Sequence, residues 1–125
     1  MTVQLQIAID CRDPLTLADF WAKALGYRVE AGIPDGWAAV VDPGEHGPRL
    51  LFHRVPEGKI VKNRLHLDVR VGGPRGTAKQ IRRPLVDADA ERLRGLGATH
   101  LRTEDDEADY FVVMQDPEGN EFCLC

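Results

Sequence analysis

The 125-residue sequence has no excess of positive charge, few aromatic residues and no long apolar run. Its 16 Lys and Arg residues are outnumbered by 20 Asp and Glu residues, which gives a formal net charge of −4. Nucleic-acid-binding proteins present cations to phosphates and aromatic rings to bases, so that class of function is not indicated. No apolar run approaches the ~18 residues that predict a membrane span, and no charged-then-apolar leader is present. We therefore expect no nucleic-acid partner and no membrane partner.

Cysteine is also scarce, with three residues in the chain. An odd number fits free thiols in a reducing compartment better than a framework of disulfides. Cys123 and Cys125 are two positions apart in a segment that predicts a strand, so their side chains point the same way. We therefore expect free thiols and a cytoplasmic location.

The length and composition predict one ordinary globular domain over residues 1–125. The chain is 43% hydrophobic and 29% charged. A chain of this size buries roughly two thirds of the surface that its unfolded form exposes. Such a core needs no disulfide to fold.

Residues 62–71 are the most informative stretch, because apolar and polar side chains alternate along it. The apolar set is Leu65, Leu67, Val69 and Val71, and the polar set is Arg64, His66, Asp68 and Arg70. This alternation predicts a strand whose apolar face is buried under helices, with a base, an acid and two guanidinium groups on the other face. The plainer interpretation is a sheet face whose charges are solvated.

The first half of the chain predicts a strand, a helix and three further strands. Alternation predicts the first strand at residues 3–10. Asp13 as N-cap, Pro14 at the first helical position and Gly26 as C-cap predict a helix over residues 14–25. Turn-forming Gly, Pro and Asp residues separate the shorter strands, which are expected at residues 27–30, 37–41 and 49–55.

The second half repeats this order. It predicts a strand at residues 64–71, a helical segment ending at residues 93–97, and strands at residues 98–102, 110–115 and 120–125. We therefore expect two tandem modules of the order βαβββ, at about residues 1–56 and 62–125. Residues 72–84 carry four cations and no acid, and we expect a mobile loop there, either a flap over an anionic ligand or a solvated surface loop.

The duplicated order, residues 62–68 and the ending Asp116-Pro117-Glu118-Gly119-Asn120 together resemble the vicinal oxygen chelate superfamily. Within it, the chain is most similar to glyoxalase-like and bleomycin-resistance-like proteins, and the resemblance covers nearly the whole sequence. It implies an α+β fold in which two four-stranded mixed sheets form a cup with the helices outside. It also implies a small-molecule ligand inside the cup and a homodimer.

Metal enzymes of that superfamily place ligands, usually histidine and glutamate, in the first and last strands of each module. The corresponding positions here are Gln6, Leu51, His66 and Cys123. Leucine cannot bind a cation, and an amide combined with a thiolate is a set that no common divalent ion prefers. We therefore expect no metal at that position and no other cofactor. A zinc site made of His53, His66 and the two C-terminal thiols is the alternative.

His66 without that metal has three interpretations: a base or hydrogen-bonding group of a pocket, a ligand in a rearranged metal site, or a structural histidine. Asp68 and Glu121 are expected on the same face, which favours the first interpretation. A regular strand would place Asp68 ~7 Å from His66, so we expect only an indirect contact through water or a neighbouring strand.

Further ligand-binding residues are expected on this face and at the rim of the cup. Trp37 and Tyr110 begin strands and would wall a pocket with aromatic rings, although such a ring can also cover the core. Arginines on the polar face would receive a carboxylate or a phosphate, or remain solvated at the rim. The predicted ligand-binding set is Gln6, Trp37, Arg49, His53, Arg64, Tyr110 and Cys123.

Two functions are compatible with this pattern. The first is a metal-independent lyase or isomerase in which His66 is the base and Asp68 and Glu121 are further catalytic residues. An arginine or a backbone group would stabilise the developing oxyanion. The second is a ligand-sequestering protein that, like the bleomycin-resistance proteins, catalyses nothing.

Overall fold

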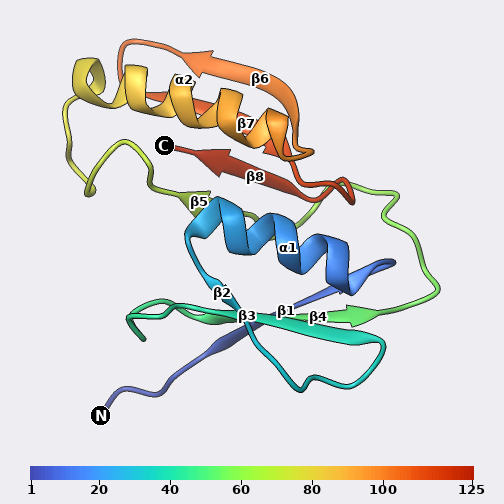
Figure 1. Ribbon diagram of the computed structural model, residues 1–125. Helices are drawn as coiled ribbons and strands as arrows, with labels where there is room; N and C mark the ends of the chain where they lie inside the picture. The colour runs from blue at the N-terminus through green and yellow to red at the C-terminus, as the bar shows by residue number, and fades with distance from the viewer. The chain divides into compact units, whose positions relative to one another are not determined.

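The computed structural model describes residues 1–125 and contains two helices and eight strands (Figure 1). In chain order these are β1 (Gln6–Cys11), α1 (Pro14–Leu25), β2 (Arg28–Val29), β3 (Trp37–Val41), β4 (Arg49–Arg54), β5 (Leu67–Val69), α2 (Lys79–Gly95), β6 (Thr99–Asp105), β7 (Tyr110–Gln115) and β8 (Glu121–Leu124). Neither helix has the length and apolar character needed to cross a membrane.

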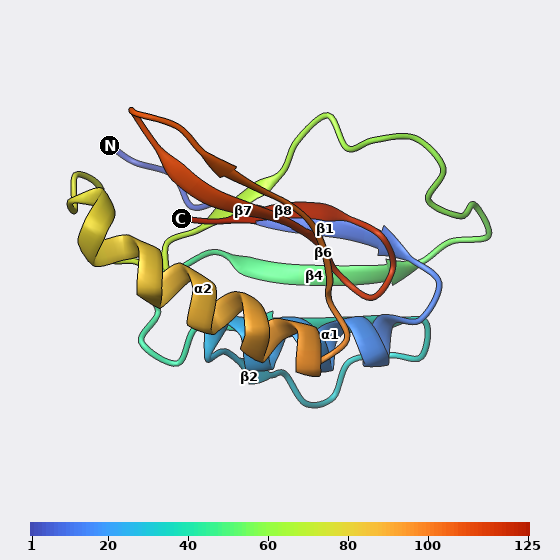
Figure 2. The ribbon, with the colours of Figure 1, turned by 90° about the horizontal axis from the view of Figure 1, so that it is seen from above.

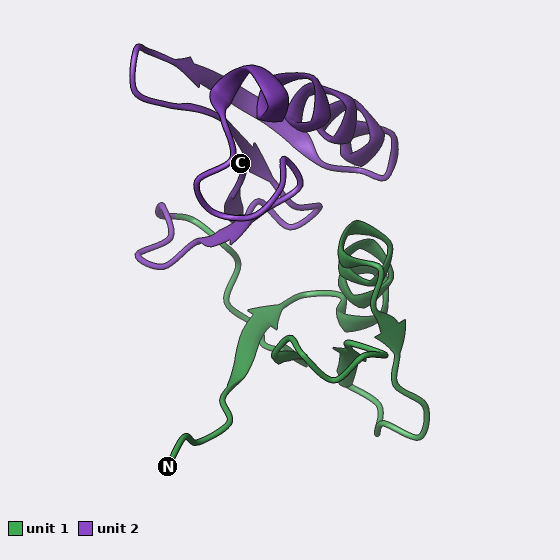
Figure 3. Cartoon of the chain, turned by 90° about the vertical axis from the view of Figure 1, so that its left-hand side faces the viewer, with its two compact units in different colours: residues 1–60 green, residues 61–125 purple.

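The chain divides into two compact units, residues 1–60 and residues 61–125, which Figure 3 shows in separate colours. Each unit has the order strand, helix, three strands. The sheet orders are β1-β4-β3-β2 and β5-β8-β7-β6, and in each the first strand pairs in parallel with the last strand of its unit. The predicted α+β fold of two βαβββ modules with two four-stranded mixed sheets is therefore confirmed.

In unit 1, α1 packs on one face of the sheet, and its predicted bounds are confirmed. The Asp13 carboxylate accepts a hydrogen bond from the Thr16 N–H, and Gly26 ends the helix with a positive φ of 70° that glycine adopts without strain. Leu17 and Trp21 are fully buried, and so are Leu50 and Phe52 on alternate positions of β4. Burial of Leu50 and Phe52 leaves Arg49, Leu51 and His53 on the opposite face.

Unit 2 has the same design, and Figure 2 shows α2 lying along one face of its sheet. Val86 and Leu93 of α2 are buried, together with Val112 and Met114 of β7 and with Phe122 and Leu124 of β8. Because side chains alternate along a strand, the intervening residues of β7 and β8 lie on the face without a helix.

The strand predicted at residues 64–71 is much shorter than expected. Only Leu67–Val69 pair with a neighbour, because β5 is an edge strand and β8 offers partners only from Phe122 to Leu124. Leu65 is 88% exposed, so the prediction that it is buried is wrong. The first strand is shortened for the same reason. It begins at Gln6, opposite the first residue of β4, and leaves Val3 and Leu5 exposed.

The predicted loop at residues 72–84 is wrong in its second half, since α2 begins at Lys79 and contains Pro84. The Arg82 side chain fixes this first part of the helix by donating to the carbonyl oxygens of Thr77 and Tyr110 at 3.0 and 2.9 Å. A loop remains at residues 72–78. The other predicted elements are present with adjusted ends, most clearly β6, which continues to Asp105.

Candidate functional site

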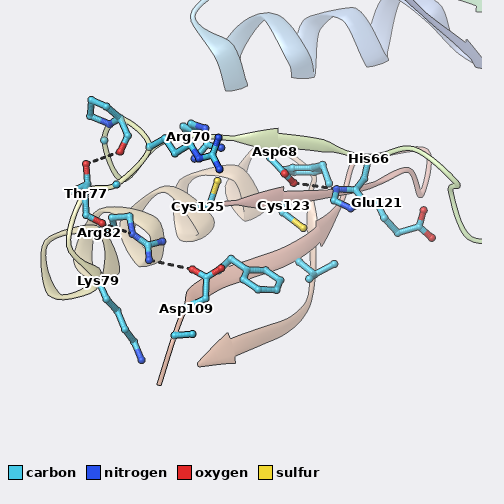
Figure 4. A pocket seen from close by; sticks show the side chains of 18 of the residues that line it. His66, Asp68, Arg70, Thr77, Lys79, Arg82, Asp109, Glu121, Cys123 and Cys125 are labelled. Atoms are coloured by element: carbon cyan, nitrogen blue, oxygen red, sulfur yellow. Dashed lines mark hydrogen bonds and ion pairs between the residues drawn. The ribbon is translucent and has the colours of Figure 1, made fainter. Parts of the chain in front are cut away.

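Unit 2 contains a cavity of about 690 Å³ on the face of its sheet that α2 does not cover (Figure 4). Its walls come from the four strands of the sheet, from the start of α2, from the residues that flank β5, from the loop at residues 73–77 and from the turn before β7. All of the lining residues belong to unit 2. Glu121, Cys123 and Cys125 face this cavity, as the alternation along β8 predicted, because Phe122 and Leu124 take the buried positions.

His66 and Asp68, which both line this cavity, are in direct contact. The His66 Nδ1 lies 3.1 Å from the Asp68 Oδ1. The expectation of only an indirect contact is therefore wrong, because it assumed the spacing of a regular strand. His66 instead lies just before β5, next to a bend at Arg64 and Leu65, and there the side chains need not follow the pleat. Both side chains remain accessible, with 44% and 51% of their surface exposed.

Cys123 approaches this pair from the neighbouring strand. The parallel pairing of β5 and β8 sets Cys123 opposite Asp68. One donor atom each of His66, Asp68 and Cys123 lies within 4.8 Å of the others. Burial, and then the negative charge of Asp68, raise the pKa of the Cys123 thiol. The free thiol therefore stays protonated at neutral pH and is a poor nucleophile.

Glu121 lines the same cavity and also contacts the segment before β5. Its carboxylate accepts a hydrogen bond from the Asn63 backbone N–H at 3.0 Å. This contact ties the segment before β5 to the start of β8. The catalytic role expected for Glu121 remains a prediction.

The cavity carries more positive than negative charge. Six of its lining residues are Lys or Arg and three are Asp or Glu. Three of the cations form ion pairs with nearby carboxylates, namely Lys79 with Asp105, Arg82 with Asp109, and Arg102 with Glu104. The other three cations, Lys62, Arg70 and Arg75, make no ion pair. Arg64, which was expected here, is exposed and is not part of the lining.

Four of the predicted ligand-binding residues lie in unit 1. The Arg49 guanidinium is bonded to the Glu30 carboxylate through two nitrogens and to the Gln6 amide oxygen at 2.6 Å. Arg49 therefore already has a carboxylate partner in Glu30, and its ligand-binding role remains a prediction. Trp37 and His53 stack with ring centroids 3.8 Å apart, and their binding role remains a prediction.

Tyr110 is not a pocket wall. Its side chain is buried on the face that carries α2, where its hydroxyl donates to the Asp87 carboxylate. The sequence predicted the start of this strand but not its phase, and the phase turns Phe111 and Val113 toward the cavity instead. Burial, together with the Asp87 hydrogen bond, raises the pKa of Tyr110.

Sequence reasoning also missed Arg75, Arg82 and Asp109 as lining residues. The excess of cations at residues 72–84 was the available signal, but it was assigned to a loop that could move freely. The alternation placed His66 and Asp68 on one face, but their direct contact was not expected, because His66 lies before β5 and not within it.

A family model for a glyoxalase-like domain matches residues 6–125. Among solved structures, one similar chain is a glyoxalase/bleomycin resistance protein/dioxygenase family enzyme from Burkholderia phytofirmans PsJN. The identity is 18% and the TM-score 0.73, over 95% of this chain and 94% of the other. Another is the same type of domain from a Frankia species, at 17% identity and a TM-score of 0.67, over 99% and 96% of the two chains.

A third similar structure is the E126Q mutant of the fosfomycin resistance protein FosX from Listeria monocytogenes. It is complexed with Mn(II) and 1S,2S-dihydroxypropylphosphonic acid. The identity is 12% and the TM-score 0.72, over 99% of this chain and 90% of the other. At these identities the three likenesses describe the fold alone. No curated protein matches the sequence.

Proposed function

Because the chain belongs to the glyoxalase-like domain family, we propose that the cavity of unit 2 binds a small anionic metabolite and that His66 moves a proton on it. The observation that carries this proposal is the contact between the His66 Nδ1 and the Asp68 carboxylate. The assignment of the chain as a glyoxalase-like domain rests on the family match over residues 6–125.

The His66–Asp68 pair has the arrangement of an oriented general base. A carboxylate that accepts a hydrogen bond from the Nδ1–H group leaves the Nε2 lone pair of a neutral imidazole free to accept a proton from carbon or oxygen. The same carboxylate stabilises the imidazolium that forms. His66 can then return the proton to another atom of the ligand, which is an isomerisation, or donate it to a departing group, which is a lyase reaction.

The cations of the cavity supply the charge that such a reaction needs. Lys62 and Arg102 line the cavity, and their positive charges act on the Cys123 thiol. An enolate or similar oxyanion that develops beside His66 would be stabilised by this field. Arg70 and Arg75, which have no ion pair, suit the carboxylate or phosphate group of a ligand.

The residues do not fit the metal set of histidine and glutamate that the superfamily's metal enzymes use. Leu51 has no donor atom, and the Gln6 amide oxygen already accepts a hydrogen bond from Arg49. The proton transfer proposed here therefore uses only the protein's own groups.

The test is the exchange of a ligand's carbon-bound hydrogen with deuterated water, followed by NMR. Small carboxylates and phosphate esters that raise the melting temperature of the protein would be tested in this assay. We expect His66→Ala to slow the exchange by about 10²-fold or more. His100→Ala is the matched control, because His100 lies on β6 beside Thr103 and outside the cavity. Unchanged exchange in His66→Ala would remove His66 from the mechanism.

The second candidate function is sequestration of the ligand without catalysis. The exposure of the His66 and Asp68 side chains favours it, since proton-transfer sites usually exclude water. A ligand that binds, shows no hydrogen exchange and is recovered intact would support sequestration over catalysis.

A further inference from the structure

His66, Asp68 and Cys123 bring together three different donor atoms that zinc accepts: an imidazole nitrogen, a carboxylate oxygen and a cysteine sulfur, which gives up its proton when it binds the ion. We propose that these three residues form a binding site for a borderline-soft divalent cation such as Zn²⁺. The sequence alone predicted no metal here, because Gln6, Leu51 and Cys123 replace the superfamily's usual ligands.

The distances allow such a site after small side-chain movements. The three donor atoms lie within 4.8 Å of one another. In a tetrahedral shell with ligand distances of 2.0–2.3 Å, donor atoms are roughly 3.3–3.8 Å apart. Rotations that shift each donor by about 1 Å close this difference. The backbone is already in place, since Asp68 and Cys123 are paired opposite each other in the sheet.

The donor set selects the class of cation. Mg²⁺ and Ca²⁺ prefer oxygen ligands alone, and a thiolate with an imidazole disfavours them. Three protein ligands also leave one position of a tetrahedral ion open to water or to a small ligand. All three ligands come from unit 2, whereas the superfamily's usual positions are shared between the two modules and include Gln6 and Leu51.

This site does not depend on the proposed function, and the two make opposite demands on His66. An imidazole nitrogen that binds a cation cannot accept a proton. A bound cation would therefore inhibit proton transfer by His66, so Zn²⁺ is expected to slow turnover of any substrate found for the protein.

The experiment is a titration of the full chain, freed of affinity tag and treated with chelator, with Co²⁺ as the probe. A thiolate bound to cobalt gives a charge-transfer absorption, which reports the Cys123 ligand directly and needs no substrate. We expect about one equivalent of Co²⁺ to saturate this band, and Zn²⁺ to displace it.

Substitutions test which of the residues in and around the proposed site bind the cation. We expect Cys123→Ser to remove the band and Asp68→Asn to weaken binding by about tenfold or more. Cys125→Ser is the matched control, because Cys125 lies on the same strand and face while its thiol approaches the Val69 carbonyl oxygen at 3.8 Å. That variant should keep the band.

Absence of a charge-transfer band in the unaltered protein would overturn the proposal. So would a band that survives in Cys123→Ser or disappears in Cys125→Ser. Because Cys123→Ser removes the band without touching the His66–Asp68 contact, failure of the cation site and failure of the proposed catalysis are distinguishable.

Discussion

The contact between His66 and Asp68 makes Asp68 the residue whose replacement is most informative. In Asp68→Asn the side chain keeps its size but loses the charge that stabilises an imidazolium. We expect kcat to fall by about tenfold or more with little change in KM, because the loss affects the step in which the proton moves. Steady-state kinetics on a substrate from the exchange screen measures both constants. An unchanged kcat would leave His66 acting alone.

Asp42 contributes to the way in which the stability of unit 1 depends on pH. Its carboxylate accepts hydrogen bonds from the backbone N–H groups of Gly44 and Gly47, both at 2.8 Å, and of His46 at 3.1 Å. These bonds lower the pKa of Asp42. A lowered pKa contributes stability at pH values above the ordinary carboxyl pKa of about 4, and this contribution is lost as the pH falls through the lower folded-state value.

We therefore expect Asp42→Asn to destabilise the protein at neutral pH and to differ less from the unaltered protein as the pH falls below about 4. Denaturant unfolding at a series of pH values measures the difference. Asp35→Asn is the control, because the Asp35 side chain is 94% exposed. A constant difference for Asp42→Asn over the whole range would contradict the assigned cause.

The sequence predicted the face on which some site residues lie, but not all of their contacts. The alternation along β8 predicted that Glu121 and Cys123 share a face, because that pattern depends only on the pleat. It could not predict that Asp68 touches His66 or that Tyr110 turns toward Asp87. Those contacts depend on a bend and on the phase of a strand, which neighbouring elements determine.

Pro84 is the unusual residue among the elements, since it lies inside α2. Proline has no N–H and cannot donate the helical hydrogen bond of its position. Its side chain is exposed, so little packing is lost when it is replaced. We expect Pro84→Ala to raise the free energy of unfolding by about 1 kcal/mol or more.

Denaturant unfolding of Pro84→Ala measures this change, and Ala88→Pro in the same exposed part of α2 is the opposite variant, expected to destabilise strongly. An unchanged free energy of unfolding in Pro84→Ala would mean that the helix is already adapted to proline at this position.

The elements differ in how well the sequence predicted them. The helix at residues 14–25 was predicted to the residue, because Asp13, Pro14 and Gly26 mark its ends locally. The start of α2 was missed because Ala78 gives no side-chain cap and Pro84 suggests a loop. The short length of β5 was missed because it depends on how far β8 extends, which is information from another part of the chain.

At the scale of the molecule, several large apolar residues flank the two edge strands β1 and β5 and remain exposed. They are Val3, Leu5, Ile60, Val61 and Leu65, at 70–92% exposure. Large apolar residues that stay exposed often mark an interface with another chain. The homodimer expected from the family resemblance remains a prediction, and we expect these residues to contribute to it.

Sedimentation at micromolar concentration tests this expectation. We expect a dimer, and a shift toward monomer in Leu65→Asp, because a charge in an apolar interface is costly. Leu15→Asp is the control, since Leu15 is an exposed apolar residue of helix α1. A 13.9 kDa species alone in the unaltered protein would exclude the dimer.

The parallel pairing of the first and last strands in each unit has a consequence for the order of folding. In unit 2, Val69 and Cys125 are in contact although 56 residues separate them, and in unit 1 the separation from Gln6 to Arg49 is 43 residues. Closing such long loops costs conformational entropy before the strand contacts contribute any stabilising free energy. These pairs are therefore expected to form late in folding. Asp68 and Cys123 meet only when that pairing is complete. The cobalt absorption, followed during refolding, would therefore report when β5 and β8 pair in unit 2.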